Sequence, residues 1–544
     1  MGSMFQDIFY GRKPVVELLK KRYLGLKEGY RQNIALVGPR HIGKSVVLHK
    51  FLSDMDDKDV IHVYVDLEHK DANYFFAKFI GSILHNYSKV TGLPLHEDIA
   101  LLLESTKSTI PETAKAIVKI QSDLLHHRLT DAYKGILALP EIFTAETGKF
   151  CVLVLDEFQN LEDYSLPNLY QDLSKKIMTQ KKCLYILTSS YPEKARIILN
   201  EKLSLLFGNF EIITLECFDH KTSQEFIGIF LGEIKIGESL QNFLIDFTGG
   251  HPLYLTLILE ELRHLTVVHR QSDIYTPLLA KAVENVIFSR WGVISRHFEL
   301  MVEALSFGKG NKIVASILIA LSNNRNKRRD LSKLLGVKQG LVSQKINRLI
   351  EDEVVAGNGQ YLYLKDKLFR YWVKYVFQRK MKAIDLDSTK LYKEFIDEFN
   401  YAIAEFQVNA KKDLTSRIVE LLYCFDSESI HINGRKYKLP VFNKIVPVKA
   451  REEKQYPFDV MKASTADGFW YILFKRGMMC ESDISQFIND SKKQRMKPLK
   501  CIVISPSSLD DNARLKALQE KMWIWNENEL SELTNFFDKP FIVR

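Results

Sequence analysis

The stretch NIALVGPRHIGKSVVLHKFL, residues 33–52, constrains the fold of this chain more than any other feature. An apolar run predicts a β-strand, the pattern G-x-x-x-x-G-K-S follows it, and apolar residues at helical spacing come next. Backbone N–H groups at the start of a helix point the same way, and glycines let the chain turn tightly enough to aim them at phosphate oxygens. The stretch therefore predicts a phosphate cradle between a buried strand and a helix.

Each position of this pattern has an expected role. Lys44 is expected to reach the β- and γ-phosphates and to serve in catalysis, while the Ser45 hydroxyl is expected to ligate Mg²⁺. The remaining candidates for nucleotide binding in this stretch are Gly38, Pro39, Arg40, His41, Ile42, Gly43 and Val46. ATP, its product ADP and Mg²⁺ are thus the expected ligands, although the pattern alone does not separate ATP from GTP.

A second apolar strand is predicted in KFCVLVLDEFQNL, and it ends in Asp156 and Glu157. Carboxylates at the C-terminal end of a buried parallel strand lie where open α/β sheets place their ligands. Asp156 is expected to hold Mg²⁺ from its second coordination shell, and Glu157 to orient and polarise the attacking water. Two further strands, VIHVYVDLE at 60–68 and KKCLYILTSS at 181–190, alternate with helices, which predicts a doubly wound parallel sheet.

Four short elements, in order along the first half of the chain, resemble those of the archaeal-type P-loop ATPases, which are close to the AAA+ and STAND groups. They are FYGRKP with Arg12, the glycine-rich loop itself, LDEFQNL, and FTGGHPLYL with Pro252. The resemblance implies that Arg12 packs near the nucleotide and that Pro252, in a helical lid, lies against the base. It also implies a γ-phosphate sensor among the polar residues that end the strand 181–190, which are Thr188, Ser189 and Ser190, and Ser189 is the candidate for nucleotide binding. An ordinary transition from strand to loop is the alternative.

Two positions depart from the pattern of this family. Lys13 and Pro14 follow the first Gly-Arg pair, where relatives usually carry a glutamate soon afterwards. Asn209 stands in LLFGNF where relatives often carry an arginine that stimulates hydrolysis, and such an arginine accelerates phosphoryl transfer by several orders of magnitude. Slow hydrolysis is therefore expected, with Arg196 as a candidate substitute, and slow turnover suits a switch better than a motor.

From residue 313 the pattern changes to three helices and a hairpin, with GNG at 357–359 as its tip. This order predicts a winged helix, whose third helix can enter a major groove. The residues that this helix would expose to DNA are Ser343, Gln344, Lys345 and Arg348. The basic run NNRNKRRD at 323–330 favours DNA contact. The alternative is a module that packs against protein and senses nucleotide state, as in many ATPases of this group.

The C-terminal part, residues 390–544, resembles in its order of elements the restriction-endonuclease-like fold that often accompanies these ATPases. Metal-dependent nucleases of that kind need carboxylates from two strands and a nearby lysine. Asp459 and Lys475 match the first and last of these, but Leu473 stands where the middle carboxylate is needed, and leucine cannot ligate a hard cation. We therefore expect a degenerate nuclease domain. Two alternatives would restore cleavage: a strand alignment shifted by one pleat, or a carboxylate supplied from elsewhere, such as Glu481.

These patterns divide the chain into four expected parts: a P-loop ATPase core at 1–215, a helical lid at 216–305, a winged helix with an aromatic bridging helix at 306–385, and a nuclease-like α/β domain at 386–544. The expected fold class is α/β. The leading hypothesis is a slowly hydrolysing ATP switch that couples nucleotide state to the other domains and binds DNA. The alternatives are a nucleotide-controlled protein adaptor or scaffold with no nucleic-acid role, and an active ATP-regulated nuclease.

The amino-acid composition indicates which broad class of protein the chain belongs to. The 544 residues are 46% hydrophobic and 26% charged, which is typical of globular proteins, and no apolar run is long enough to span a bilayer. Six cysteines show no CxxC or zinc spacing, so we expect a reduced, cytoplasmic protein without a membrane partner. The net charge of +9 and the basic run at 491–500 favour DNA as a partner, beside protein partners or self-association.

Overall fold

The computed structural model describes residues 9–55, 57–67, 72–203, 208, 210–289, 292–306, 311–382, 388–432, 435–448, 458–506, 509–537 and 539. The chain forms two compact units. One comprises Met1–Phe226 with Gly250–Thr256, and the other comprises Ile227–Gly249 with Leu257–Arg544. Two helices, α9 (His220–Leu231) and α11 (Pro252–Val268), each begin in the first unit and end in the second.

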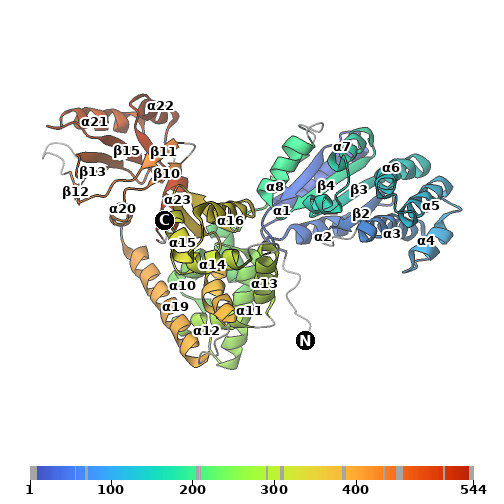
Figure 1. Cartoon of the computed structure of the whole chain (residues 1–544), viewed down its shortest axis with the longest axis horizontal. Coiled ribbons are helices and arrows are strands. Elements are labelled where there is room, and N and C mark those ends of the chain that lie inside the picture. Colours follow the sequence, from blue (N-terminus) through green and yellow to red (C-terminus); the bar gives the residue numbers. More distant parts are fainter. Residues whose placement is uncertain are drawn as a thin grey trace. The chain divides into compact units, whose positions relative to one another are not determined.

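The first unit is built on a five-stranded sheet in the order β2-β3-β4-β1-β5, and every neighbouring pair of strands runs parallel (Figure 1). Its strands are β1 (Asn33–Val37), β2 (Val60–Asp66), β3 (Phe150–Asp156), β4 (Cys183–Ser189) and β5 (Phe210–Thr214). Because β4 lies between β1 and β3, the ends of these three strands are adjacent. The phosphate loop after β1 and the acidic pair at the end of β3 therefore share one edge of the sheet.

Helices cover both faces of this sheet. They are α1 (Lys13–Lys27), α2 (Lys44–Asp54), α3 (Ala72–Thr91), α4 (Ile99–Thr106), α5 (Pro111–Leu125), α6 (Leu129–Thr147), α7 (Leu169–Thr179) and α8 (Pro192–Ile197), with the 3₁₀ helix η1 (Phe158–Tyr164) and the π-helix η2 (Ile198–Lys202). Alternate residues of a strand enter two separate apolar cores, since Ile34 packs with α1 and α2 whereas Ala35 packs with α3 and α7. The doubly wound parallel sheet predicted from the sequence is present.

The second unit begins with a helical segment and a two-stranded pairing of β6 (Lys235–Ile236) with β7 (Asp273–Ile274). Its helices, besides the ends of α9 and α11, are α10 (Glu238–Thr248), α12 (Thr276–Phe288) and α13 (Val293–Leu305). Among the residues that the structure describes, no helix is both long and apolar enough to cross a membrane.

Three helices and a hairpin follow in the order that the sequence predicts. They are α14 (Asn311–Ser322), α15 (Arg328–Leu335), α16 (Gln339–Glu351), β8 (Val355–Asn358) and β9 (Tyr361–Leu364). Gly357 and Asn358 lie within β8, so the turn falls at Gly359 and Gln360 rather than on the whole GNG triplet. The aromatic segment then forms α17 (Lys367–Trp372), the π-helical η4 (Val373–Phe377) and α18 (Gln378–Lys382).

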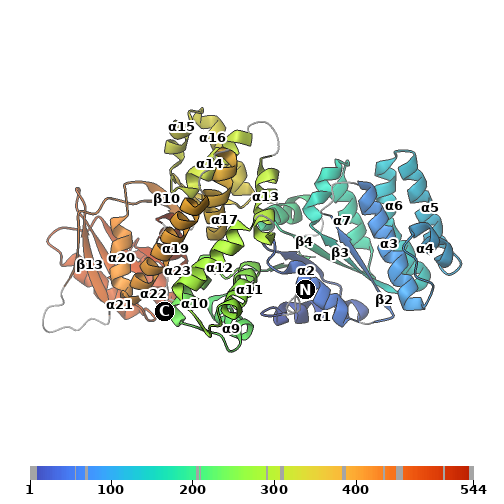
Figure 2. The ribbon, with the colours of Figure 1, turned by 90° about the horizontal axis from the view of Figure 1, so that it is seen from below.

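The C-terminal part contains a mixed five-stranded sheet in the order β12-β13-β14-β15-β16. Its strands are β12 (Lys444–Pro447), β13 (Asp459–Ser464), β14 (Phe469–Phe474), β15 (Lys500–Ile504) and β16 (Trp523–Trp525). The helices are α19 (Ser388–Lys411), α20 (Leu414–Tyr423), α21 (Glu481–Lys492), α22 (Asp511–Gln519) and α23 (Glu527–Phe536), and a separate hairpin joins β10 (Ser429–Ile432) to β11 (Arg435–Lys438). Helices α20 and α23 pack on one face of the sheet, and α21 and α22 on the other (Figures 1 and 2).

Candidate functional site

The loop between β1 and α2 requires glycine at two positions, for two different reasons. Gly43, which precedes α2, has a φ of 102°, and His41 two residues earlier also has a positive φ, of 58°. A Cβ atom on Gly38 would lie 2.4 Å from the carbonyl oxygen of Leu215. The left-handed conformation therefore requires glycine at position 43, and the close approach of the chain after β5 requires it at position 38. Both glycines of the sequence pattern serve the geometry of a phosphate cradle.

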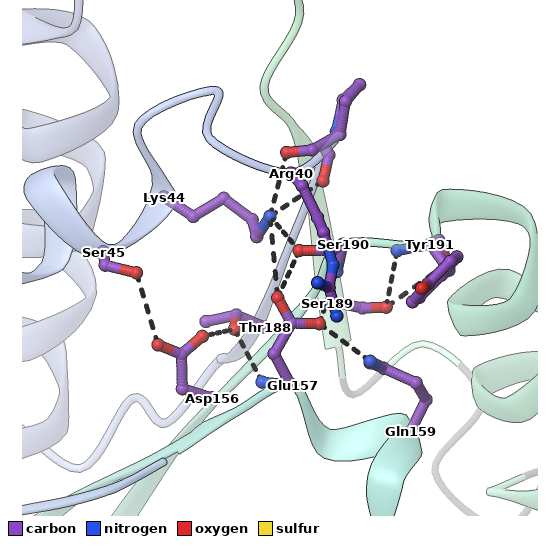
Figure 3. A network of polar contacts seen from close by, with 12 residues as sticks. Arg40, Lys44, Ser45, Asp156, Glu157, Gln159, Thr188, Ser189, Ser190 and Tyr191 are labelled. Atoms are coloured by element: carbon purple, nitrogen blue, oxygen red, sulfur yellow. Dashed lines mark hydrogen bonds and ion pairs between the residues drawn. The ribbon is translucent and has the colours of Figure 1, made fainter. Parts of the chain in front are cut away.

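Lys44 is the first residue of α2, and its side chain is held inside the loop (Figure 3). Its ammonium donates hydrogen bonds to the carbonyl oxygens of Gly38 and Pro39 at 2.9 and 3.0 Å, and to the Ser190 hydroxyl at 2.8 Å. The Glu157 carboxylate lies 3.9 Å from the same nitrogen. With only 5% of its surface exposed, this ammonium is a buried positive charge at the place where the sequence expects phosphates.

The Asp156 carboxylate, at the end of β3, is surrounded by three hydroxyl groups. Thr188, on β4, donates to Oδ1, and Tyr64, on β2, donates to Oδ2. The Ser45 hydroxyl, at the start of α2, donates to Oδ2 at 3.3 Å (Figure 3). Hydroxyl and carboxylate oxygens are the ligands that Mg²⁺ takes from proteins. The residues present therefore fit a magnesium ion between Ser45 and Asp156.

Glu157 lies beside Lys44 and is held by several donors (Figure 3). Its carboxylate accepts hydrogen bonds from the Ser190 hydroxyl, from the Ser190 N–H at 2.9 Å and from the Gln159 amide at 2.7 Å. Its own N–H donates to Thr188 Oγ1 at 3.1 Å. The backbone of Glu157 is left-handed, with a φ of 56°, and such conformations persist where the surroundings enforce them, which is common at functional sites. Glu157 is thus fixed in orientation next to the phosphate loop.

Ser189, the candidate chosen from the sequence, does not face this site. Its hydroxyl accepts a hydrogen bond from the Tyr191 N–H at 3.1 Å and donates to the Tyr191 carbonyl at 3.3 Å. Ser190 and Thr188 instead contact the lysine and the two carboxylates (Figure 3). Thr188 and Ser189 are successive residues of β4 and so point to opposite sides, and Ser190, the residue after the strand, reaches the same site as Thr188. The structure therefore places Thr188 and Ser190, in place of Ser189, at the site.

Arg12 lies where the first Gly-Arg element was expected, next to the loop. Its guanidinium donates to the carbonyl oxygens of Glu216 at 2.5 Å and Ile42 at 3.4 Å, and its central carbon lies 5.0 Å from the ring centroid of Phe218. Burial lowers the pKa of Arg12 below its ordinary value, although the group stays charged at neutral pH. Arg12 therefore joins the phosphate loop to the segment that leads into α9.

His251 brings a second distant segment to the loop. Its Nε2 lies 3.2 Å from the Arg40 carbonyl oxygen, which can only accept, so this nitrogen carries the proton. The ring stacks on Tyr254 with centroids 4.1 Å apart. Burial lowers the pKa of His251 to about 4, so the imidazole is neutral at pH 7. Pro252 follows as the first residue of α11, and its contact with a base stays a prediction.

The candidate DNA-binding residues lie together on α16. Gln344 and Arg348 are exposed, and Lys345 is half-buried. Arg348 lies 3.7 Å from the carboxylate of Asp352, one helical turn further along. The helix thus presents a polar face, and its contact with DNA stays a prediction.

Two of the four cations in the basic run at 323–330 are paired with carboxylates. Lys327 lies 2.5 Å from Asp426 and 3.8 Å from Glu428, and Arg329 lies 2.8 Å from Glu428. The run therefore gives less support to DNA contact than the sequence suggests, because two of its cations are neutralised by carboxylates just before β10.

The structure does not bring Asp459 and Lys475 together. Asp459 is paired across the strands with Phe474, which belongs to the core beneath α20 and α23, and it accepts a hydrogen bond from Thr415 at 3.0 Å. Lys475 lies 2.6 Å from Asp483 on α21, on the face that Leu473 also occupies. The two residues thus point to opposite faces of the sheet. Within the described ranges no group of three or more His, Cys, Asp or Glu side chains is placed to hold a metal ion.

The sequence linked the hydrolysis rate to two residues, Asn209 and Arg196. Asn209 lies outside the described residues. Arg196 is partly exposed and pairs with Glu193 at 2.6 Å on its own helix. Nothing in that arrangement directs Arg196 toward the phosphate loop.

The parallel sheet, the phosphate loop and the acidic pair define an α/β fold with a P-loop arrangement. No protein-family model matches the chain, and no curated protein matches its sequence. Solved structures that match the chain include a Walker-type ATPase of Pyrococcus abyssi, which is 15% identical with a TM-score of 0.47, and the match covers 68% of this chain and 97% of the other.

Two other similar structures come from Aeropyrum pernix. The ORC2 protein, in complexes with ADPNP and ADP, is 14% identical, has a TM-score of 0.41 and covers 73% of this chain and 97% of its own. The ORC1 protein, in complex with DNA, is 11% identical, has a TM-score of 0.39 and covers 70% of this chain and 95% of its own. TM-scores below 0.5 do not decide a function, so the proposals below rest on this chain's own residues.

Proposed function

We propose that this protein binds ATP with Mg²⁺, hydrolyses it slowly, and uses the bound nucleotide to switch the conformation of its second unit. The observation that carries the proposal is the network between loop and acidic pair: Ser190 joins Lys44 to Glu157, and Ser45 contacts Asp156 (Figure 3). One side of this network offers positive charge and N–H donors to phosphates, and the other offers oxygen ligands to a metal ion.

The roles of the residues follow from these positions. Lys44 and the N-terminus of α2 bind the phosphates, while Ser45 and Asp156 hold the metal ion. A magnesium ion held there would supply positive charge to neutralise the charge of the phosphates. Glu157 accepts a proton from the attacking water, and Ser190 with Gln159 sets the direction of its carboxylate.

One feature supports slow turnover. The Lys44 ammonium donates to two carbonyl oxygens of its own loop, those of Gly38 and Pro39. Lys44 must exchange these partners before it can reach a phosphate oxygen. Exchange of charge-assisted hydrogen bonds in a buried site costs free energy, and that cost slows turnover.

Continuous helices support the coupling between nucleotide and second unit. His251, which contacts the loop at Arg40, immediately precedes α11, and Phe218, which contacts Arg12, lies just before α9. Both helices end in the second unit. A ligand shifts a conformational equilibrium by its difference in affinity for the two states. Phosphates that bind in the loop change the contacts of His251 and Phe218 at the start of these helices. Such a change gives the nucleotide different affinities for the two conformations.

A protein-adaptor role for the second unit is the second candidate, and one observation favours it over DNA binding. The hairpin β8–β9 packs against the hairpin β10–β11, because Asn358 exchanges hydrogen bonds with the backbone of His431. A Cβ atom on Gly359 would lie 2.0 Å from the Ser429 carbonyl oxygen. The hairpin that would act as the wing thus serves as a packing surface within the chain.

Two variants test the nucleotide site. Lys44→Ala should lose ATP binding, and Glu157→Gln should keep the affinity for ATP while hydrolysis falls about 100-fold or more, because a catalytic base contributes on the order of 10²–10⁴. Lys50→Ala is the matched control, since Lys50 also lies on α2 but pairs with Asp54 at the surface. Hydrolysis at the normal rate in Glu157→Gln, or ATP binding by Lys44→Ala equal to that of Lys50→Ala, would contradict the assigned roles.

The salt dependence of DNA binding tests whether the second unit has a DNA partner or a protein partner. Phosphate contacts make the affinity for DNA fall steeply as salt rises. Fluorescence anisotropy with a labelled duplex, at low and at physiological salt, should show binding that weakens with salt if α16 contacts DNA. Binding that is undetectable even at low salt favours the adaptor.

A further inference from the structure

Tyr64 lies on β2, next to the acidic strand, and the sequence assigned it no role. Its hydroxyl donates to Oδ2 of Asp156, the same oxygen to which the Ser45 hydroxyl donates. Oδ1 of Asp156 accepts from Thr188 on the opposite neighbouring strand. Both carboxylate oxygens of Asp156 are therefore held by hydroxyl donors, one from β2 and one from β4.

The ring of Tyr64 is itself fixed in place. It stacks on His49 of α2, with centroids 5.4 Å apart and planes inclined by 24°. The Tyr64 N–H donates to Ser82 Oγ at 3.2 Å. The side chain is thus a rigid donor directed at one carboxylate oxygen.

We infer that Tyr64 is a positioning residue for the magnesium ion of this site, because its hydroxyl, with that of Thr188, fixes the Asp156 carboxylate so that Oδ2 faces Ser45. The inference rests on the nucleotide-binding function proposed above. A carboxylate that is already oriented loses less conformational freedom when it takes up an ion than one that must first rotate. Residues that orient metal-binding groups typically contribute about 10- to 100-fold to metal affinity.

The Tyr64→Phe variant isolates this role, because it removes one hydroxyl and keeps the ring that stacks on His49. The matched control is Tyr133→Phe. Tyr133 is a buried tyrosine of the same unit, and its hydroxyl donates to the Leu169 carbonyl oxygen at 3.2 Å, away from the acidic pair. The two variants lose the same group, and only one of them touches Asp156.

The experiment is a titration of Mg²⁺ against the binding of a fluorescent ATP analogue to the full chain. Tyr64→Phe should raise the half-saturating Mg²⁺ concentration about tenfold. Tyr133→Phe should match the wild type. Binding of the analogue in excess EDTA should be equal in all three proteins, because the loop and Lys44 contact the phosphates without the metal ion. The isosteric Thr188→Val variant, which frees Oδ1 and leaves Tyr64 intact, should show the same rise and serves as the second test.

The outcomes separate the inference from the proposal beneath it. A normal response to Mg²⁺ in Tyr64→Phe overturns the positioning role, and so does an equal rise in Tyr133→Phe, which would indicate general loosening of the fold. If the wild type binds no nucleotide with or without Mg²⁺, the proposed function fails as well. If the wild type binds the nucleotide analogue but Tyr64→Phe needs no more Mg²⁺ than the wild type, the positioning role fails and the proposed function stands.

Discussion

Replacing Ser190 with alanine removes one hydroxyl that links the two charged groups of the site. That hydroxyl accepts a hydrogen bond from Lys44 at 2.8 Å and donates one to the Glu157 carboxylate. The Ser190 N–H, 2.9 Å from Glu157, is unaffected by the change. The variant therefore loosens Glu157 and the tip of Lys44 while the loop backbone and the metal ligands stay as they are.

The size of the effect follows from the kind of bond that is lost. A hydrogen bond to a charged group contributes about 1.5–3 kcal/mol. Since about 1.4 kcal/mol in the activation free energy corresponds to a factor of ten in rate, loss of one such bond in the transition state slows hydrolysis roughly 10- to 100-fold. The affinity for ATP should change by less than about threefold, because interactions made equally in ground and transition states are retained.

Ser189→Ala is the matched control, since it removes the neighbouring buried hydroxyl, which contacts only Tyr191 among the partners described above. Single-turnover hydrolysis and thermal melting should be measured for both variants. Ser189→Ala should hydrolyse ATP at the wild-type rate and melt slightly earlier. Hydrolysis slowed as much by Ser189→Ala as by Ser190→Ala, or unaltered in Ser190→Ala, would refute the placement of these residues.

Three further outcomes are expected. Burial lowers the pKa of His251 from 6.5 to about 4, so between these pH values the unfolded chain binds a proton that the folded chain does not. The free energy of unfolding is therefore highest above about pH 6.5 and falls as the pH falls toward 4, by about 2 kcal/mol at pH 5. When chemical denaturation is compared at pH 7 and pH 5, His251→Asn should lack this part of the loss. Gly359→Ala places a Cβ 2.0 Å from the Ser429 carbonyl oxygen. The matched control is Gly336→Ala, because Gly336 has a similar left-handed φ but open space around it, and this change should lower the free energy of unfolding by about 1–2 kcal/mol. Gly359→Ala should lower it by more, and equal losses in urea denaturation would show that the hairpins do not pack as described. Plasmid DNA should stay intact with Mg²⁺ or Mn²⁺, and cleavage that disappears in Asp459→Ala would contradict the degenerate nuclease.

Spacing alone was enough to predict the phosphate loop and its acidic partner. The positions of Lys44 and Asp156 follow from a strand, a glycine pattern and an apolar run that ends in two acids, all of which are local in sequence. The choice between Ser189 and Ser190 depended on where β4 ends, and a shift of one residue reverses the side to which a side chain points. Local pattern does not determine that boundary to one residue.

The remaining features depend on pairing between distant segments. Tyr64 reaches Asp156 because β2 is the neighbour of β3, and a single sequence does not specify strand order. Asp459 and Lys475 lie on opposite faces because β13 pairs with β14 in a register that sets Asp459 opposite Phe474. The pairing of Lys327 with Asp426 joins residues far apart in the chain, so a basic run that reads as a surface becomes part of an internal contact.

The most direct measurement is a calorimetric titration of nucleotide-free protein with ATP, and separately with GTP, in the presence of Mg²⁺. A single saturable site for ATP that is abolished in Lys44→Ala is the expected result. No heat of binding with either nucleotide at millimolar concentration, or undiminished binding by Lys44→Ala, would contradict the claim that the glycine-rich loop after β1 is a nucleotide site.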